Sequence, residues 1–248
     1  NMINMTKTIM AIFLAMGTAT LSAGSAVAGD DELSFDISPY FWATAINGDV
    51  DVEDLPSARL DMDFSDVWDD FESGAAAFLT VRKGPWLAMA DFSYLKMEDD
   101  RQLLMMSVSS EIDTTLASLA VGRRIAGDMG APAMDAFIGG RYNRYDVDIE
   151  ISPLGSASRT EEWVDPIVGV NLSVPFSKRI SAGVLADIGG FGVGSDLAWE
   201  AMPVIGFSLS DMIMLRAGYR WLDVDYDKDD FHFDAMTQGW LAGLGFRF

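Results

Sequence analysis

The stretch FHFDAMTQGWLAGLGFRF, residues 231–248, decides the fold class of this 248-residue chain. From Trp240 onward its apolar positions recur at every second residue: Trp240, Ala242, Leu244, Phe246 and Phe248. The positions between them are Leu241, Gly243, Gly245 and Arg247. A period of two predicts a β-strand with one apolar face. A large apolar face at the end of a chain is typical of a transmembrane β-strand, whose outer face meets lipid.

The same alternation recurs along the chain and is clearest between Trp163 and Val174. Short turns near Gly84, Gly127, Ser177 and Ser210 alternate with longer polar segments. The polar segments are residues 49–72, 98–112 and 150–162, which we expect to form long loops. Short turns at one end and long loops at the other are typical of bacterial barrels. The sequence therefore predicts an all-β, transmembrane, antiparallel up-and-down β-barrel of about ten strands, with eight or twelve as alternatives.

The N-terminal segment has the layout of an export signal. Lys7 precedes an apolar run from Ile9 to Met16, and small residues follow up to Ala28. This layout predicts a secretory signal peptide over residues 1–28, cleaved after Ala28, and a barrel over residues 29–248. We expect both ends of the mature chain to lie on the side of the short turns, which is then the periplasmic side.

The composition excludes several classes of function. The chain has 38 acidic and 17 basic residues, a net charge of −21, and no cysteine. Nucleic acid is an unsuitable partner because its recognition needs a basic footprint. Disulfides and thiolate metal sites are impossible without cysteine. We expect neither a cofactor nor a resident metal.

Several motifs carry a resemblance to a known family. They are PYFWA (39–43), FSD (64–66), RKGPW (82–86), WVDP (163–166), DIGGFGVGS (187–195) and GYRW (218–221). Together they are similar to a family of small proteobacterial outer-membrane β-barrel proteins, which is largely uncharacterised. The C-terminal stretch also resembles the closing strand of such barrels, which end in an aromatic residue as a signal to the insertion machinery. The resemblance implies a Gram-negative outer membrane, contact with lipid and lipopolysaccharide, and insertion through Phe248.

Charged residues on the predicted inner face are the candidate functional residues. They are Asp91, Asp135, Arg141, Asp165, Asp187, Glu200, Arg216 and Arg220. Two interpretations stay open. The charges form either the selectivity lining of a small pore or an ion-pair network that fills a narrow barrel. Aromatic residues near the strand ends are expected to form girdles at the membrane surface; they are Tyr40, Trp42, Trp86, Trp163, Trp199, Tyr219, Trp221 and Trp240.

Two further groups are candidates near the loops. Asp223, Asp225, Asp227 and Asp229 alternate like calcium ligands, but they lack the glycine and glutamate of an EF-hand, so they predict at most weak divalent-cation binding. His232 is the only histidine. Outer-membrane proteases of the omptin type use a histidine with carboxylates at a similar height, yet no matching acidic motif is present, and we expect no catalytic site.

The expected function is structural, or that of a narrow passive channel for ions and small solutes, in a monomeric barrel. The alternative is a surface-interaction, adhesin-like barrel that uses its acidic segments. An enzyme at the rim, a protease or lipid hydrolase, is the least favoured class.

Overall fold

The computed structural model describes residues 32–52, 58–62, 71–103, 106–128, 130–152, 155–228 and 231–248. The predicted signal peptide lies outside these ranges. The strands are β1 (Leu33–Val52), β2 (Ala58–Met62), β3 (Phe71–Lys83), β4 (Trp86–Leu103), β5 (Met106–Ala126), β6 (Ala133–Ser152), β7 (Gly155–Pro175), β8 (Ile180–Gly190), β9 (Leu197–Ser208), β10 (Ile213–Lys228) and β11 (Phe231–Arg247).

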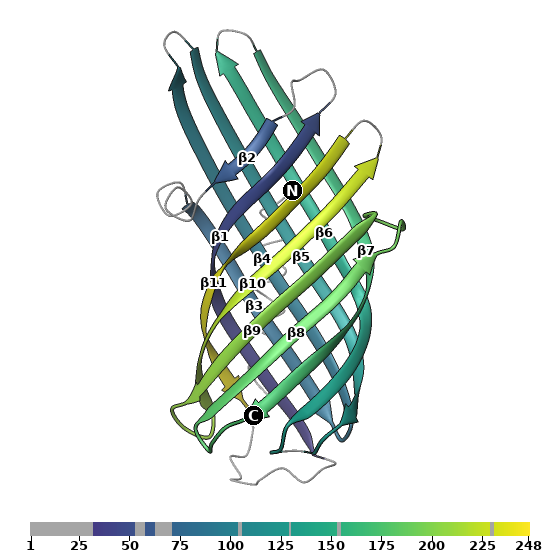
Figure 1. The fold of residues 1–248 in the computed structure, drawn as a ribbon. Coiled ribbons are helices and arrows are strands. Elements are labelled where there is room, and N and C mark those ends of the chain that lie inside the picture. Colours follow the sequence, from purple (N-terminus) through teal and green to yellow (C-terminus); the bar gives the residue numbers. More distant parts are fainter. Residues whose placement is uncertain are drawn as a thin grey trace, which may run out of the picture.

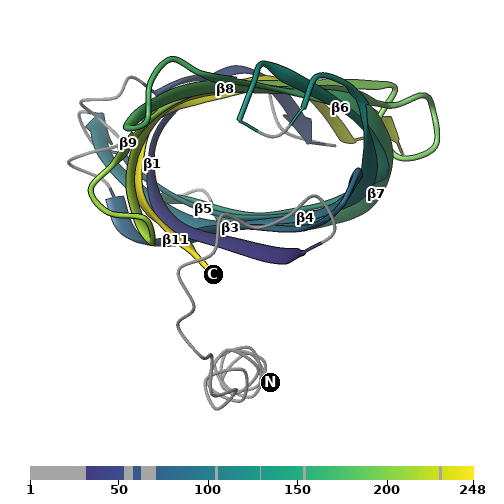
Figure 2. The same cartoon turned by 90° about the horizontal axis from the view of Figure 1, so that it is seen from below.

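The strands form one closed antiparallel barrel (Figures 1 and 2). From β3 to β11 each strand pairs with its neighbours in sequence, and β11 pairs with β1 from Asp36↔Arg247 to Val52↔Phe231. β2 pairs with β1 alone, on the side of β1 where β3 pairs nearer the C-terminal end, and it does not take part in closing the ring, which has ten strands. The predicted all-β up-and-down barrel of about ten strands is confirmed.

The two ends of the barrel differ. One end, here called the C-terminal end, carries Leu33, Phe248 and the turns that follow β3, β5, β7 and β9. The other, here called the distal end, carries the connections that follow β4, β6, β8 and β10. Strands β4 to β7 extend far toward the distal end, whereas the hairpin of β8 and β9 is shorter (Figure 1). No helix within the described ranges is long and apolar enough to cross a membrane.

The prediction of long loops over residues 98–112 and 150–162 is wrong. β4 and β5 stay paired from Glu98↔Glu111 to Leu103↔Met106, and β6 pairs with β7 as far as Ile151↔Gly155. The physical reason is that a wall with water on both sides needs no apolar alternation, although its backbone hydrogen bonds continue. Of residues 49–72, those described belong to β1, β2 and β3.

The outer face of the wall carries an apolar belt. Its most exposed members include Leu119, Ile138, Val164, Ile205 and Trp240, each more than half exposed. Soluble proteins rarely leave so continuous an apolar surface open to water. The belt has the chemistry of a surface that faces hydrocarbon.

Aromatic residues mark the borders of this belt in part. Trp86 is exposed near the C-terminal end, beneath the guanidinium of Arg123 at 5.5 Å. Tyr219 packs against Trp221 and Trp240 on the outer face. The girdle prediction is wrong for three residues, because Tyr40, Trp42 and Trp163 have the opposite parity and point into the barrel.

Substitution at Leu119 tests whether the belt meets lipid. Leu119 is 66% exposed and lies four residues from Arg123 and four from Thr115, which faces Arg144, so it is near the middle of the belt. Leu119→Arg should lower the free energy of unfolding by roughly 2–4 kcal/mol relative to Leu119→Ala, the cost of a cation at the bilayer midplane. Denaturant titration in lipid vesicles measures it. Equal stability of the two variants would show that this face is not in hydrocarbon.

Candidate functional site

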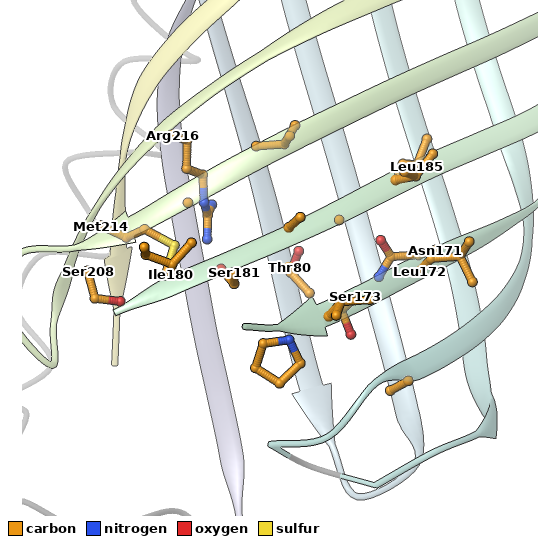
Figure 3. A pocket seen from close by; sticks show the side chains of 18 of the residues that line it. Thr80, Asn171, Leu172, Ser173, Ile180, Ser181, Leu185, Ser208, Met214 and Arg216 are labelled. Carbon is orange, nitrogen blue, oxygen red and sulfur yellow. The ribbon is translucent and has the colours of Figure 1, made fainter. Parts of the chain in front are cut away.

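The half of the interior next to the C-terminal end is hollow (Figure 3). Inward positions of β8, β9 and β11 there carry small residues: Ser181, Gly183, Gly206, Ser208 and Gly243. They leave a cavity of about 460 Å³, a size typical of small-molecule sites. Larger side chains line it where it meets the packed clusters of the interior: Tyr40, Phe78, Leu185, Met202 and Val204.

Two arginine clusters stand on the wall around this cavity. In the first, Asp135 accepts hydrogen bonds from Arg82 at 2.6 Å and Arg124 at 3.3 Å. In the second, Asp36 accepts from Arg216 at 2.5 Å and from Arg247 at 3.1 Å. Each cluster therefore sets one carboxylate between two guanidinium groups.

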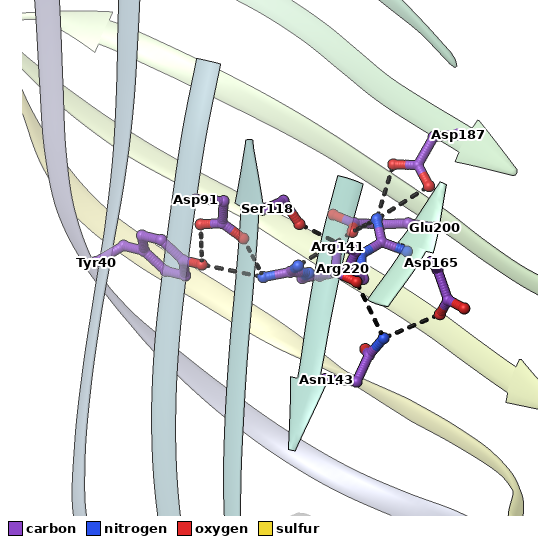
Figure 4. Close-up of polar contacts among 9 residues, drawn as sticks. All are labelled: Tyr40, Asp91, Ser118, Arg141, Asn143, Asp165, Asp187, Glu200 and Arg220. Carbon is purple, nitrogen blue, oxygen red and sulfur yellow. Dashed lines mark hydrogen bonds and ion pairs between the residues drawn. The ribbon is translucent and has the colours of Figure 1, made fainter. Parts of the chain in front are cut away.

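A central ion-pair network crosses the interior beyond the cavity (Figure 4). The Arg141 guanidinium lies 2.8 Å from Asp187 and 2.5 Å from Glu200. The Arg220 guanidinium lies 3.0 Å from Glu200 and 2.9 Å from Asp91. Glu200 thus joins the two arginines, which come from β6 and β10 on different parts of the wall.

Tyr40 connects the network to the cavity. Its hydroxyl donates to Asp91 at 2.8 Å and accepts from Arg220 at 3.0 Å, while its side chain lines the cavity. The five charged members of the network are each at most 8% exposed. A space of about 20 Å³ lies between four of them, Asp91, Arg141, Asp187 and Glu200, and the neighbouring apolar side chains, and it holds about one water molecule. The network therefore closes the inner end of the cavity.

Burial decides how the network behaves energetically. Each ion that leaves water costs several kcal/mol, and attraction offsets this cost only with good geometry and further hydrogen bonds. Here each carboxylate contacts a guanidinium, and Ser118 accepts a hydrogen bond from Arg141 at 3.4 Å. Loss of one member leaves its partners charged and buried, so the network is sensitive to single substitutions.

Asp165 forms a separate buried cluster. It accepts hydrogen bonds from the Asn143 amide at 2.9 Å, the Trp163 indole at 3.0 Å and the Ser195 backbone N–H at 2.6 Å. The last bond ties the connection between β8 and β9 to β7. Gly194 is required there because a Cβ would collide with the Asp165 carboxylate.

An aromatic cluster fills the interior on the distal side. Trp163 stacks on Tyr226 with ring centroids 3.9 Å apart, and Tyr145 lies 4.6 Å from Phe233. Phe231 stacks parallel to Phe233. All five side chains are at most 6% exposed. Together the ion-pair network and the aromatic cluster occupy the barrel interior in succession.

The eight candidate charges all lie on the inner face. Five of them, Asp91, Arg141, Asp187, Glu200 and Arg220, meet in the central network. The other three do not join it: Asp165 is in its own cluster, and Asp135 and Arg216 are in the arginine clusters near the C-terminal end.

Sequence reasoning missed several partners of these charges. They are Asp36, Tyr40, Arg82, Arg124, Asn143 and Arg247. It also missed the aromatic cluster. The signal was available, since each has the inward parity of its strand; Phe231 and Phe233, for example, share the parity of Leu241.

The described residues of the acidic run lie on the outer face of the barrel wall. Asp223, Asp225 and Asp227 are on β10 near the distal end, and Asp229 lies outside the described residues. Burial raises the pKa of the Asp225 carboxyl above its ordinary value, and the facing Asp234 raises it further. No group of three potential ligands in the described ranges could hold a metal ion. His232 shares this outer parity, 38% exposed and 3.9 Å from Asp227.

No protein-family model and no curated protein sequence matches the chain. Among solved structures, the outer membrane protease OmpT from Escherichia coli is similar with a TM-score of 0.56 and 10% identity over 92% of this chain and 100% of that chain. The translocator domain of autotransporter NalP from Neisseria meningitidis has a TM-score of 0.44 and 13% identity, over 97% of this chain and 96% of that chain. The attachment invasion locus protein Ail of Yersinia pestis has a TM-score of 0.39 and 12% identity, over 88% of this chain and 99% of that chain.

The likeness to OmpT, together with the closed wall, defines the fold class. The chain has the fold of an outer-membrane β-barrel. Its ten-stranded wall surrounds an interior that the network and the aromatic cluster fill toward the distal end.

Loss of Arg220 tests the network. Arg220→Met leaves Asp91 and Glu200 buried with fewer partners and should lower the free energy of unfolding by roughly 3–5 kcal/mol. The control Arg144→Met removes a pair with Asp146 whose side chains are 40% and 28% exposed, and it should cost about 0–1 kcal/mol. Denaturant titration in vesicles measures both. Equal losses would contradict a buried network.

Proposed function

We propose that the protein is a non-conducting barrel of the Gram-negative outer membrane that acts at the cell surface through its acidic distal rim. The observation that carries this proposal is the closure of the interior by the Arg141–Glu200–Arg220 network. Of the functions expected from the sequence, this favours surface interaction over a passive channel.

The membrane location rests on the outer face. The apolar belt supplies the surface that hydrocarbon requires, and the pairing of β11 with β1 joins the first and last strands of the sheet, which would otherwise be open edges. We place the C-terminal end in the periplasm, with Phe248 as the signal for the insertion machinery. Because the chain closes its own wall, a monomer surrounded by lipid and lipopolysaccharide suffices.

A passive channel needs a continuous aqueous path, and two successive barriers oppose one. The side chains of the ion-pair network are each at most 8% exposed, and the space beside them is about 20 Å³. The aromatic cluster beyond it has ring centroids as close as 3.9 Å. Rings packed this closely exclude water and ions. The charged lining therefore serves as a filling of the barrel and not as a selectivity filter.

The distal rim offers a surface instead. Its acidic residues include Glu111, Asp113, Asp146, Glu162, Asp196, Asp223, Asp225, Asp227 and Asp234. Among the side chains that the structure describes there, the basic ones are fewer: Lys96, Arg144, Arg159 and Lys228. Strands that stay paired beyond the belt hold these charges on a rigid wall. Such a surface attracts basic partners.

We propose no enzymatic role, although OmpT is a protease. His232, the only histidine in the sequence, lies on the outer parity of β11 and not on the inner face. A general base must reach the substrate with its partner groups around the same space. At His232 the nearby carboxylate, Asp227, is 3.9 Å away and 66% exposed.

Reconstitution in planar bilayers tests non-conduction. The wild-type barrel should give no current steps at any voltage at which the membrane itself stays intact. A variant with both barriers removed should conduct: Arg141→Ser, Asp187→Ser, Glu200→Ser and Arg220→Ser together with Trp163→Ser, Tyr226→Ser and Phe233→Ser. This set removes two cations and two anions, so it leaves the summed charge of the network unchanged.

Folding of both proteins is checked by their resistance to unfolding in dodecyl sulfate before heating. Regular steps from the folded wild type, of a size similar to those of the opened variant, would contradict the proposal.

Binding of a basic probe tests the acidic rim. The barrel in nanodiscs should bind oligolysine, and Asp223→Asn, Asp225→Asn and Asp227→Asn together should weaken that binding severalfold. Added salt should weaken it as well, because exposed charges are screened. The control Glu32→Gln, Asp128→Asn and Asp211→Asn removes the same charge from the C-terminal end. Equal effects of the two triple variants would show that no specific rim surface is involved.

A further inference from the structure

The cavity at the C-terminal end has a charge opposite to that of the chain. Its lining contains the cations Arg124, Lys178, Arg179, Arg216 and Arg247, and the anion Asp128. The protein as a whole carries a net charge of −21. The overall composition therefore does not account for a basic cavity. The fold brings the cations of the lining together from different strands and turns.

Pairing within the wall leaves this positive charge uncancelled. Asp36 forms ion pairs with both Arg216 and Arg247, and Asp135 forms ion pairs with both Arg82 and Arg124. Each cluster therefore keeps one cation in excess. Lys178 and Arg179 add two more from the exposed turn between β7 and β8, whose backbone is held by the Ser177 hydroxyl.

The remaining walls combine hydroxyl and apolar groups. Ser173, Ser181 and Ser208 stand along β7, β8 and β9, and Arg216 projects from β10 toward the same space (Figure 3). The apolar lining includes Phe78, Leu185, Met202, Val204 and Leu241. The Tyr40–Asp91–Arg220 contacts close the inner end, so a ligand must enter and leave through one mouth.

We propose that this cavity is a binding site for a single-chain anionic amphiphile, such as an alkyl phosphate or carboxylate. The apolar chain lies against the Phe78–Leu185–Met202 wall, and the anionic group lies among the cations of the mouth. A volume of about 460 Å³ accommodates a molecule of this kind. The site receives its ligand from the C-terminal end and does not pass it through the barrel.

Octyl phosphate is the probe that tests the site. The barrel in nanodiscs is titrated by calorimetry, with empty nanodiscs as the blank, against octyl phosphate, octanol, octylammonium and inorganic phosphate. Octyl phosphate should bind saturably and at least tenfold more tightly than the other three. Methyl-labelled methionine spectra should show shifts at Met202 and Met214, which line the cavity, and none at Met236 on the outer face of β11.

Two variants separate the head-group and chain contacts. Lys178→Ser with Arg179→Ser should weaken octyl phosphate about tenfold, because charge-assisted contacts are lost. The matched control Lys83→Ser with Arg123→Ser removes two cations of the same end that do not line the cavity and should bind as the wild type does. Ser181→Phe should fill the cavity and abolish binding, whereas Ala186→Phe, on the outer parity of β8 and outside the cavity lining, should not.

Equal binding of octanol or octylammonium, unshifted Met202 and Met214 signals, or unchanged binding by Ser181→Phe would each overturn the proposal. The source of the ligand is tested in the same nanodiscs. If lysophosphatidate dissolved in the bilayer displaces octyl phosphate, the site holds with the membrane as the source. If octyl phosphate binds saturably and lysophosphatidate does not displace it, the proposed site holds with the aqueous phase as the source of the ligand.

Discussion

The pairing of β11 with β1 is the contact on which the rest of the structure depends. It runs from Asp36↔Arg247 to Val52↔Phe231, with an interruption at Ser38 and Pro39, and gives backbone partners to the first and last strands of the sheet. Within hydrocarbon no water replaces a missing hydrogen bond, so an open sheet is excluded there. Gly239 permits this seam, because a Cβ at that position would collide with the Ala43 carbonyl. Closure then fixes which residues of every strand face inward.

Once the wall is closed, the size of the inward residues decides what the interior does. Near the C-terminal end these residues are small, as at Gly183, Gly206 and Gly243, and a cavity remains. Toward the distal end they are large and aromatic, as at Trp163 and Phe233, and the space is filled. The central network stands at the transition. The same alternation thus produces a hollow half and a solid half.

The sequence predicted the features that depend on alternation alone. The strands, their turns and the inward parity of Asp91, Arg141 and Arg220 follow from a period of two. Which charges pair could not be predicted, because that depends on the tilt and register of strands far apart in sequence; Arg220 and Asp91 are an example. The distal extension of the strands was missed because its polar segments resemble loops when both faces meet water.

The charge of the protein is divided between its ends, and this division follows from the same geometry. Cations such as Arg82, Arg216 and Arg247 lie around the hollow end, where the carboxylates of Asp36 and Asp135 each contact two guanidinium groups. Carboxylates dominate the distal wall, where facing residues such as Asp225 and Asp234 crowd together. A net charge therefore describes neither end. Among the described residues, cations line the cavity of the hollow end and carboxylates gather on the distal wall, and surfaces of opposite charge attract opposite partners.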